Sequence, residues 1–224
     1  ISFEEKGHQL ERPVACDIII KSPGIANTSE ILLALTDAGK EIIGEIEWAY
    51  RNADGKIIGI TGSNGKTTTT GLCHHFLQAA GMDAAKVGNV GEGFCHFLAE
   101  HNAAWYVCEL SSFQLEDVET FRPRIGILLN ITPDHLDRYD YSLDKYADAK
   151  MRMMRNMTEE DTLIYNAMDP VTVAKVIGAE SEDRLWPIRE TDVTGEDKVN
   201  VKDDLVLDLS TSRLMGRHNQ VNVI

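Results

Sequence analysis

The sequence predicts an α/β fold, with a mostly parallel sheet covered by helices on both faces and part of a smaller α/β unit before it. Three observations predict this fold. Strand-like and helix-like segments alternate along most of the 224 residues, a glycine-rich loop joins one strand to one helix, and polar side chains follow several strands. A composition of 43% hydrophobic and 26% charged residues is ordinary for a globular chain that buries a core.

The first α/β layer indicates part of a Rossmann-like domain. An apolar strand at 17–21 leads into Ser22-Pro23-Gly24, a helix at 28–38 ends at Gly39, and a strand at 41–43 precedes a short helix at 45–50. The polar segment 51–56 is the best candidate for a linker. We therefore expect a partial N-terminal domain at residues 1–52 and a central domain at residues 53–224.

In the central domain, strands and helices alternate as they do around a parallel sheet. The expected strands lie at 57–61, 104–109, 125–130 and 161–165, and the expected helices at 65–80, 93–101, 142–156 and 170–177. Shorter strands from about residue 183, including one at 204–209, predict an antiparallel edge. Ligands of such sheets collect at the carboxyl ends of the strands.

Residues 59–67 form a phosphate-binding loop pattern between a strand and a helix, as in P-loop NTPases. Glycines at 62 and 65 permit a tight turn with inward amides, and the helix start adds free N–H donors and the positive end of its dipole. The residues expected to hold the nucleotide phosphates are Gly62, Ser63, Asn64, Gly65, Lys66, Thr67 and Thr68. Lys66 should reach the outer phosphates, and the Thr67 hydroxyl should help to hold magnesium. The usual motif has glycine where this chain has Ile60, so the tripeptide Gly65-Lys66-Thr67 could occur in a loop by chance. The strand before the loop and the helix after it favour nucleotide binding instead.

Charge and cysteine content exclude several classes of protein. A net charge of −14 argues against a broad contact with a nucleic-acid backbone or an anionic membrane. No apolar run approaches the ~20 residues that span a bilayer and no signal peptide is evident, so we expect a cytoplasmic protein. Cys16, Cys73, Cys95 and Cys108 lack close pairing and predict reduced core cysteines, although spacing leaves a single catalytic thiol open.

Three ionisable residues outside the loop are candidates for the chemistry. Glu109 ends an apolar strand and is expected to contact magnesium, the alternative being a surface glutamate. His135 follows the next strand and is either a metal ligand or a solvated loop histidine. Lys150 lies on the apolar side of its helix. It either extends its ammonium to water or, if buried, needs an anionic partner or a chemical change that removes its charge.

Together these segments closely resemble the Mur ligase family. The likeness extends from the strand at Asp17 to Asn222, and it is carried by the phosphate loop and residues 109–116, 130–139 and 149–150. The run Ser111-Ser112-Phe113-Gln114 points to the branch of the family that adds D-glutamate to UDP-N-acetylmuramoyl-L-alanine.

The resemblance implies ATP and Mg²⁺ as cofactors and assigns roles to individual residues. Lys66, His135 and Lys150 would be catalytic, with Lys150 carbamylated so that it binds a second magnesium beside Thr67, Glu109 and His135. The substrate would contact Ser22, Pro23, Gly24, Asn89, Ser111 and Gln114, and the adenine would lie near Asn222.

The implied reaction is ATP-dependent amide bond formation through an acyl phosphate. Family members carry a carboxy-terminal domain for D-glutamate. Because nothing after Ile224 supplies it, we expect a monomeric fragment of a small-molecule enzyme, inactive as a ligase alone. Two alternatives stay open: a P-loop nucleotide-binding module without ligase chemistry, and a sister ligase such as a folylpolyglutamate synthetase.

Overall fold

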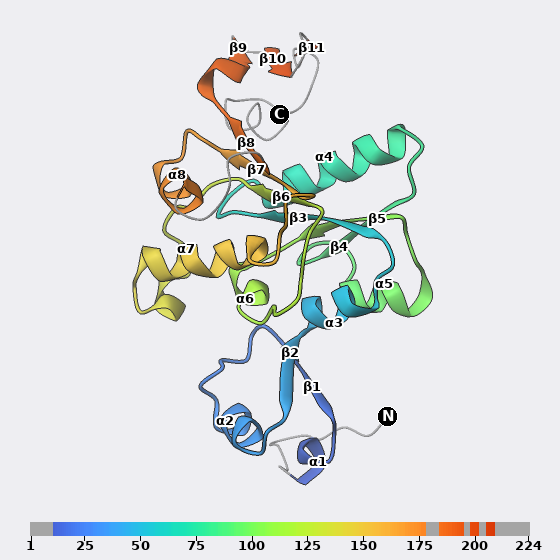
Figure 1. The fold of residues 1–224 in the computed structure, drawn as a ribbon, viewed down its shortest axis with the longest axis vertical. Helices are drawn as coiled ribbons and strands as arrows, with labels where there is room; N and C mark the ends of the chain where they lie inside the picture. The colour runs from blue at the N-terminus through green and yellow to red at the C-terminus, as the bar shows by residue number, and fades with distance from the viewer. Residues whose placement is uncertain (1–10, 178–183, 195–197, 202–204, 209–224) are drawn as a thin grey trace.

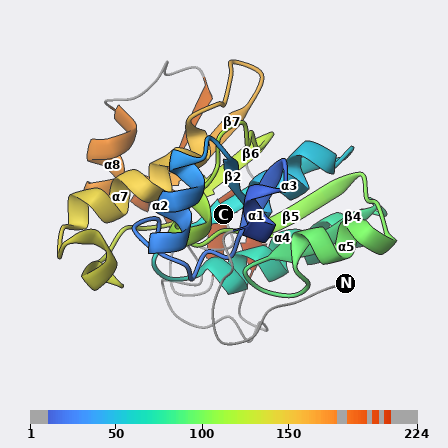
Figure 2. The ribbon, with the colours of Figure 1, turned by 90° about the horizontal axis from the view of Figure 1, so that it is seen from below.

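A computed structural model describes residues 11–177, 184–194, 198–201 and 205–208. Its centre is a six-stranded parallel sheet in the order β4-β5-β3-β6-β7-β8 (Figure 1). A small unit built on the parallel pair β1-β2 lies at one end of the molecule and faces the viewer in Figure 2. The predicted α/β class, with its mostly parallel sheet, is confirmed.

The strands of the main sheet are β3 (Lys56–Thr61), β4 (Ala84–Gly88), β5 (Trp105–Glu109), β6 (Ile125–Leu128), β7 (Thr162–Asn166) and β8 (Leu185–Ile188). Its helices are α4 (Lys66–Ala79), α5 (Phe94–Glu100), α6 (Ser112–Leu115), α7 (Leu143–Met151) and α8 (Pro170–Ile177), with 3₁₀ turns η1 (Leu136–Tyr139) and η2 (Arg152–Met154). The small unit contains α1 (Glu11–Val14), β1 (Ile18–Lys21), α2 (Glu30–Asp37) and β2 (Glu41–Gly44), and α3 (Glu45–Asn52) follows it.

Helices cover both faces of the sheet because consecutive strand residues point to opposite sides. On one face, Ile58 and Ile60 of β3 pack with Val107 and Leu129 beneath Leu77 of α4. On the other face, a larger core joins the sheet to α3, α5, α7 and α8. Since β3 lies inside the sheet, with β5 and β6 as its neighbours, the loop after β3 lies between the carboxyl ends of two other strands.

Two features of the sheet differ from the sequence prediction. β4 was not predicted, because Ala84-Ala85-Lys86-Val87-Gly88 has a single β-branched residue. The predicted antiparallel edge is wrong for β8, which pairs parallel to β7 and carries Pro187 at the end of the sheet, where a missing N–H is tolerated. The antiparallel strands β9 (Val193–Thr194), β10 (Lys198–Val201) and β11 (Leu205–Asp208) form a separate sheet of their own.

Helix α3 packs mainly with the central domain, although it also contacts β1 and β2 of the small unit. Its Ile46 and Ala49 belong to the core that contains Tyr106 and Phe121. Its Glu47 has a fully buried side chain whose carboxylate accepts hydrogen bonds from three consecutive amides, at residues 119–121, at 2.8–3.0 Å. The core of the larger domain therefore includes residues of α3, which ends at Asn52.

The cysteines differ from one another in exposure. All four are free thiols, and Cys16 is exposed, in contrast to the expected core position. Burial raises the pKa of Cys73 and of Cys95 to about 11 and the pKa of Cys108 further, which keeps these three thiols protonated at neutral pH.

None of the helices in the described residues combines the length and apolar character needed to cross a bilayer.

Candidate nucleotide and metal site

The glycine loop (residues 62–65) joins β3 to α4 at the carboxyl edge of the sheet. Gly65 takes the left-handed conformation, with φ of 87°, immediately before the first helical residue. A Cβ atom on Gly62 would lie 2.9 Å from the Cβ of Leu129, so only glycine fits this approach of the loop to the end of β6. Both glycines named by the motif therefore have a structural reason.

Residues that follow β6, together with Tyr146 of α7, hold the loop in place. The Asn64 amide donates to Asn130 Oδ1 and the Asn130 amide group donates to Asn64 O, both at 2.9 Å. The Ser63 hydroxyl donates to Thr132 O at 2.9 Å and lies 3.1 Å from the Tyr146 hydroxyl. These braces connect residues that lie 66 to 83 positions apart in the sequence, which is why sequence reasoning did not identify them.

The loop offers free donors to an anion. In the described part of the chain, the amides of residues 65–68 donate to no protein acceptor, as expected for the first turn of a helix. Lys66 folds back over the loop, and its Nζ donates to Gly62 O and to Ser63 O at 2.9 Å each. An anion bound to the loop could therefore accept hydrogen bonds from both these amides and the Lys66 ammonium.

Glu109, the last residue of β5, is a buried carboxylate beside the loop. It is 1% exposed, and its two oxygens accept hydrogen bonds from Thr67 Oγ1 at 2.9 Å and Asn89 Nδ2 at 3.0 Å. Among the described residues it has no ion-pair partner. A buried carboxylate with neutral donors only is costly unless a cation completes its surroundings. Predicted residues from three elements thus meet here.

Gly88 brings β4 close enough for Asn89 to reach Glu109. Its φ is 102°, and a Cβ atom would lie 2.4 Å from the Glu109 carbonyl oxygen. The amide of Asn89 donates to that same oxygen at 2.9 Å. The glycine before Asn89 therefore positions both the backbone and the side chain of Asn89 against Glu109.

Lys150 of α7 is buried against the glycine loop. The residue is 2% exposed. Its Nζ donates to Gly62 O at 2.9 Å and lies 4.5 Å from the Tyr146 ring centroid. Burial, with the nearby ammonium of Lys66 adding repulsion, lowers the pKa of Lys150 to about 7. No carboxylate of the described residues forms an ion pair with it. A large fraction of this amine is therefore uncharged at neutral pH.

His135 lies in an exposed, strained loop. Its side chain is 61% exposed, its Nε2 lies 3.6 Å from Asp134 Oδ1, and its ring centroid is 5.4 Å from that of Phe113. His135, Asp140 and Tyr141 all have positive φ, which L-residues rarely adopt. Among the described residues, no three His, Cys, Asp or Glu side chains are grouped to hold a metal ion, and His135 forms its ion pair with Asp134 rather than with Glu109.

Apart from Asn89, which contacts Glu109, the predicted substrate residues occupy two places. Ser111 and Gln114 form a capping box at the start of α6, with Gln114 N donating to Ser111 Oγ at 3.2 Å and Ser111 N donating to Gln114 Oε1 at 3.0 Å. Ser22, Pro23 and Gly24 form a turn after β1, closed by Ile25 N donating to Ser22 O at 3.0 Å. Asn222 lies outside the described residues.

Comparison with known proteins gives a consistent result. The family pattern of the Mur ligase middle domain matches residues 60–224. The chain is 39% identical to the UDP-N-acetylmuramoylalanine-D-glutamate ligase of Bacteroides fragilis over 99% of this chain and 52% of the relative. It thus spans about half the length of the curated relatives it matches.

Two solved structures share the fold. A ligase from Neisseria meningitides, named UDP-N-acetylmuramate:L-alanyl-gamma-D-glutamyl-meso-diaminopimelate ligase, gives a TM-score of 0.64 at 17% identity over 92% of this chain and 71% of that one. MurF ligase from Thermotoga maritima, solved in complex with ADP, gives 0.57 at 15% identity over 91% and 57%. The phosphate loop, the buried glutamate and the parallel sheet agree with the family match, and the chain belongs to the Mur ligase family.

Proposed function

We propose that the protein containing this chain joins D-glutamate to UDP-N-acetylmuramoyl-L-alanine at the expense of ATP. The name and 39% identity of the Bacteroides fragilis relative support this substrate pair. The observation that carries the proposal is Glu109, a carboxylate 1% exposed and without an ion-pair partner among the described residues, next to the free amides of the glycine loop. A triphosphate with a divalent cation satisfies both groups.

The residues present fit magnesium. Carboxylate and hydroxyl oxygens are the ligands that Mg²⁺ takes in proteins, and Glu109 and Thr67 already lie 2.9 Å apart. When bound, the ion neutralises charge on the transferred phosphoryl group. His135, whose ring is exposed and whose carboxylate neighbour is Asp134, is proposed as a further ligand.

The chain's own groups then account for binding and positioning. Lys66 is proposed to exchange its contacts with Gly62 O and Ser63 O for the outer phosphate oxygens of ATP. In the proposed reaction, the substrate carboxylate attacks the γ-phosphate, ADP leaves, and the acyl phosphate that forms is displaced by the amine of D-glutamate with release of phosphate. Such a reaction depends mainly on positioning and on charge neutralisation.

Lys150 is proposed to act as a carbamate. Its neutral amine attacks CO₂, a nitrogen–carbon bond forms, and a proton is released to water, so a cation becomes an anion. The lowered pKa of Lys150, about 7, supports this step because only the uncharged amine is nucleophilic. An anion at this position relieves the repulsion between Lys150 and Lys66 and supplies oxygen ligands for a second magnesium.

The proposal also assigns each substrate to a part of the protein. We assign the uridine diphosphate to the N-terminal part, residues 1–52, at Ser22, Pro23 and Gly24, and ATP to residues 53–224, with Asn222 near the adenine. The muramoyl-alanine end is assigned to Asn89, Ser111 and Gln114. Because the chain spans about half the length of its curated relatives, we assign D-glutamate to the rest of the protein. The enzyme is proposed to be a cytoplasmic monomer. It is also proposed to bind neither nucleic acid nor membrane, because a net charge of −14 disfavours contact with either anionic surface.

The test measures which amino acid stimulates phosphate release by the whole enzyme. With UDP-N-acetylmuramoyl-L-alanine and ATP present, D-glutamate alone should stimulate release, while L-glutamate, L-alanine and meso-diaminopimelate should not. Stimulation by L-glutamate with a folate acceptor refutes the proposal in favour of a folylpolyglutamate synthetase. Release that needs no amino acid, and that survives Lys150→Ala, favours a nucleotide-binding module without ligase chemistry.

A further inference from the structure

The Ser22-Pro23-Gly24 turn is held against the central domain by two polar tethers. The first is Lys21, whose Nζ lies 2.7 Å from Asp117 Oδ2, with side chains 1% and 8% exposed. The second is Arg138, whose Nη1 donates to the carbonyl oxygen of Pro23 at 2.9 Å. The two cations thus hold the turn directly before it and within it.

Both tethers end on neighbouring residues of one short segment. Arg138 forms a two-point pair with Glu116, with Nε to Oε1 at 3.2 Å and Nη2 to Oε2 at 2.8 Å. Glu116 is the C-terminal cap of α6, and Asp117 follows it. Because a two-point guanidinium–carboxylate pair fixes both distance and orientation, the turn is placed relative to the helix that carries Ser111 and Gln114.

Arg138 has further contacts that fix its own position. Its guanidinium carbon lies 4.3 Å from the ring centroid of Phe113, a residue of α6. It belongs to η1, the 3₁₀ turn that begins directly after His135. Arg138 therefore connects the turn after β1 with the helix α6, two places assigned to the substrate above, and it lies next to the loop of His135, which is assigned to magnesium.

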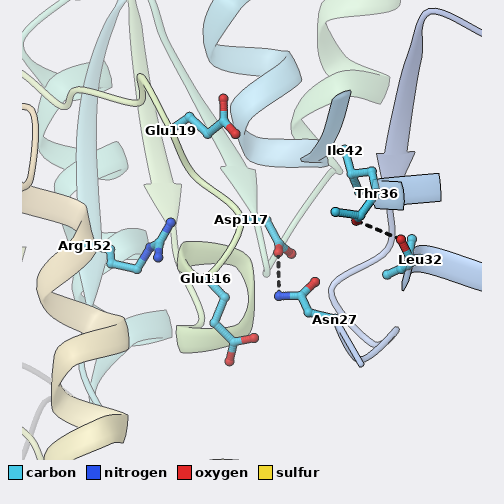
Figure 3. A pocket seen from close by; sticks show the side chains of 8 residues that line it. All are labelled: Asn27, Leu32, Thr36, Ile42, Glu116, Asp117, Glu119 and Arg152. Atoms are coloured by element: carbon cyan, nitrogen blue, oxygen red, sulfur yellow. Dashed lines mark hydrogen bonds between the residues drawn. The ribbon is translucent and has the colours of Figure 1, made fainter. Parts of the chain in front are cut away.

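Apolar packing does not close this interface. A pocket of about 240 Å³ lies between the small unit and the segment after α6, lined by Asn27, Leu32, Thr36, Ile42, Glu116, Asp117, Glu119 and Arg152 (Figure 3). Across it, Asn27 Nδ2 donates to Asp117 Oδ1 at 3.3 Å. A hollow interface leaves the orientation of the small unit to its polar contacts rather than to a dense core.

We propose that Arg138 is a positioning residue for the muramoyl substrate. By holding the Pro23 carbonyl and the Glu116 carboxylate together, it sets the separation between the turn and the Ser111–Gln114 helix start, so that one molecule reaches both. This inference rests on the proposed function, because it takes the turn and the helix to hold the two ends of that substrate. Among the described residues, Arg138 forms no hydrogen bond or ion pair with the glycine loop, so we expect ATP binding to depend on it much less than substrate binding.

The kinetic test compares Arg138→Ala and Arg138→Lys with the wild type in the whole enzyme. For Arg138→Ala we expect kcat/KM for UDP-N-acetylmuramoyl-L-alanine to fall about 100-fold, the scale of a small misplacement of reacting groups, while the KM for ATP stays within about twofold. Arg138→Lys keeps the charge but cannot contact Glu116 at two points and Pro23 at once, so its loss should be intermediate. Lys145→Ala, which removes an exposed pair with Asp140, is the matched control and should behave as the wild type.

A second measurement needs no activity. Amide hydrogen exchange in the whole enzyme should be faster at Ile25 and Ser29 in Arg138→Ala than in the wild type, with exchange at Ser63 unchanged. Wild-type enzyme that fails to respond to D-glutamate refutes the proposed function and leaves the exchange result to judge the tether. If the wild type is active, the inference is overturned by an unchanged kcat/KM for the muramoyl substrate in Arg138→Ala, or by equal losses in kcat/KM for this substrate and for ATP. Unchanged exchange at Ile25 overturns it as well.

Discussion

Replacing Lys150 with methionine should change how the stability of the fold depends on pH. Lysine in an unfolded chain has a pKa of about 10.4, whereas burial lowers the pKa of Lys150 to about 7 in the folded protein. Between these two values the unfolded chain binds more protons than the folded one, so stability rises with pH. Below about pH 7 both states are protonated and the full penalty of the buried charge applies.

The size of the effect follows from the same two pKa values. At about 1.4 kcal/mol for each unit of pKa, the linkage relation assigns to Lys150 a gain of about 2 kcal/mol in unfolding free energy from pH 7 to pH 9. Methionine has a similar length and does not titrate, so Lys150→Met should lose this gain. The wild type should therefore become about 2 kcal/mol more stable relative to the variant over that interval.

Urea unfolding of the wild type and Lys150→Met at pH 7, 8 and 9 measures this difference. The buffers are purged of CO₂, since carbamate formation removes the titrating amine. Lys145→Met, on the same helix with its ammonium exposed beside Asp140, is the control and should follow the wild type. Parallel pH dependences for the wild type and Lys150→Met would show that the buried amine keeps its proton, and this result refutes the reasoning.

Three further predictions concern the site and the domain packing. Glu109→Gln keeps two hydrogen-bonding atoms beside Thr67 and Asn89 but removes the charge. The whole enzyme should therefore lose about 100-fold or more in kcat/KM and need more Mg²⁺, while its melting temperature should not fall. A Mg²⁺ dependence equal to that of the wild type contradicts this prediction. Gly88→Ala places a methyl group 2.4 Å from Glu109 O and should lower both the melting temperature and the activity, unlike Gly71→Ala on open space. Glu47→Ala should cost about 3 to 5 kcal/mol, because three consecutive amides lose a buried acceptor. Although burial acts to raise the pKa of Glu47, hydrogen bonds from Thr120, Glu119 and Arg51 lower it overall. Its stabilisation is therefore present above about pH 4.3 and is lost as the pH falls through the lower, folded pKa.

Local patterns predicted most of the secondary structure. The helices α4, α5 and α8 and the strands β3, β5 and β7 lie within one or two residues of their expected bounds. These elements have strong periodicity or clear glycine and proline limits. The prediction failed where the local pattern contains no signal. The residues of β8 do not encode whether its neighbour runs parallel or antiparallel. The alanines of β4 do not indicate a strand.

The site was predictable in its motifs and not in its contacts. The strand–loop–helix context of Lys66 and the strand-end position of Glu109 could be read from the sequence. The sequence could not reveal that Asn130 braces Asn64 across the loop, or that the Gly62 carbonyl accepts from both Lys66 and Lys150. The contacts of Asn130 and Lys150 join distant parts of the chain and depend on the completed sheet. Ser111 and Gln114 also have a structural role as a capping box, which their three-residue spacing already indicates.

The packing of α3 has a practical consequence for recombining members of this family. The Glu47 carboxylate and the core residue Ile46 fix α3 to the larger domain, while a Cβ atom on Gly44 would lie 2.9 Å from the Cβ of Asp117. A chimaera that borrows its amino-terminal portion from another ligase should therefore be spliced just ahead of Gly44, retaining this glycine and the helix after it. A crossover after residue 52 would bring in a foreign helix whose partners on the recipient are missing, and such hybrids should express as aggregates more often.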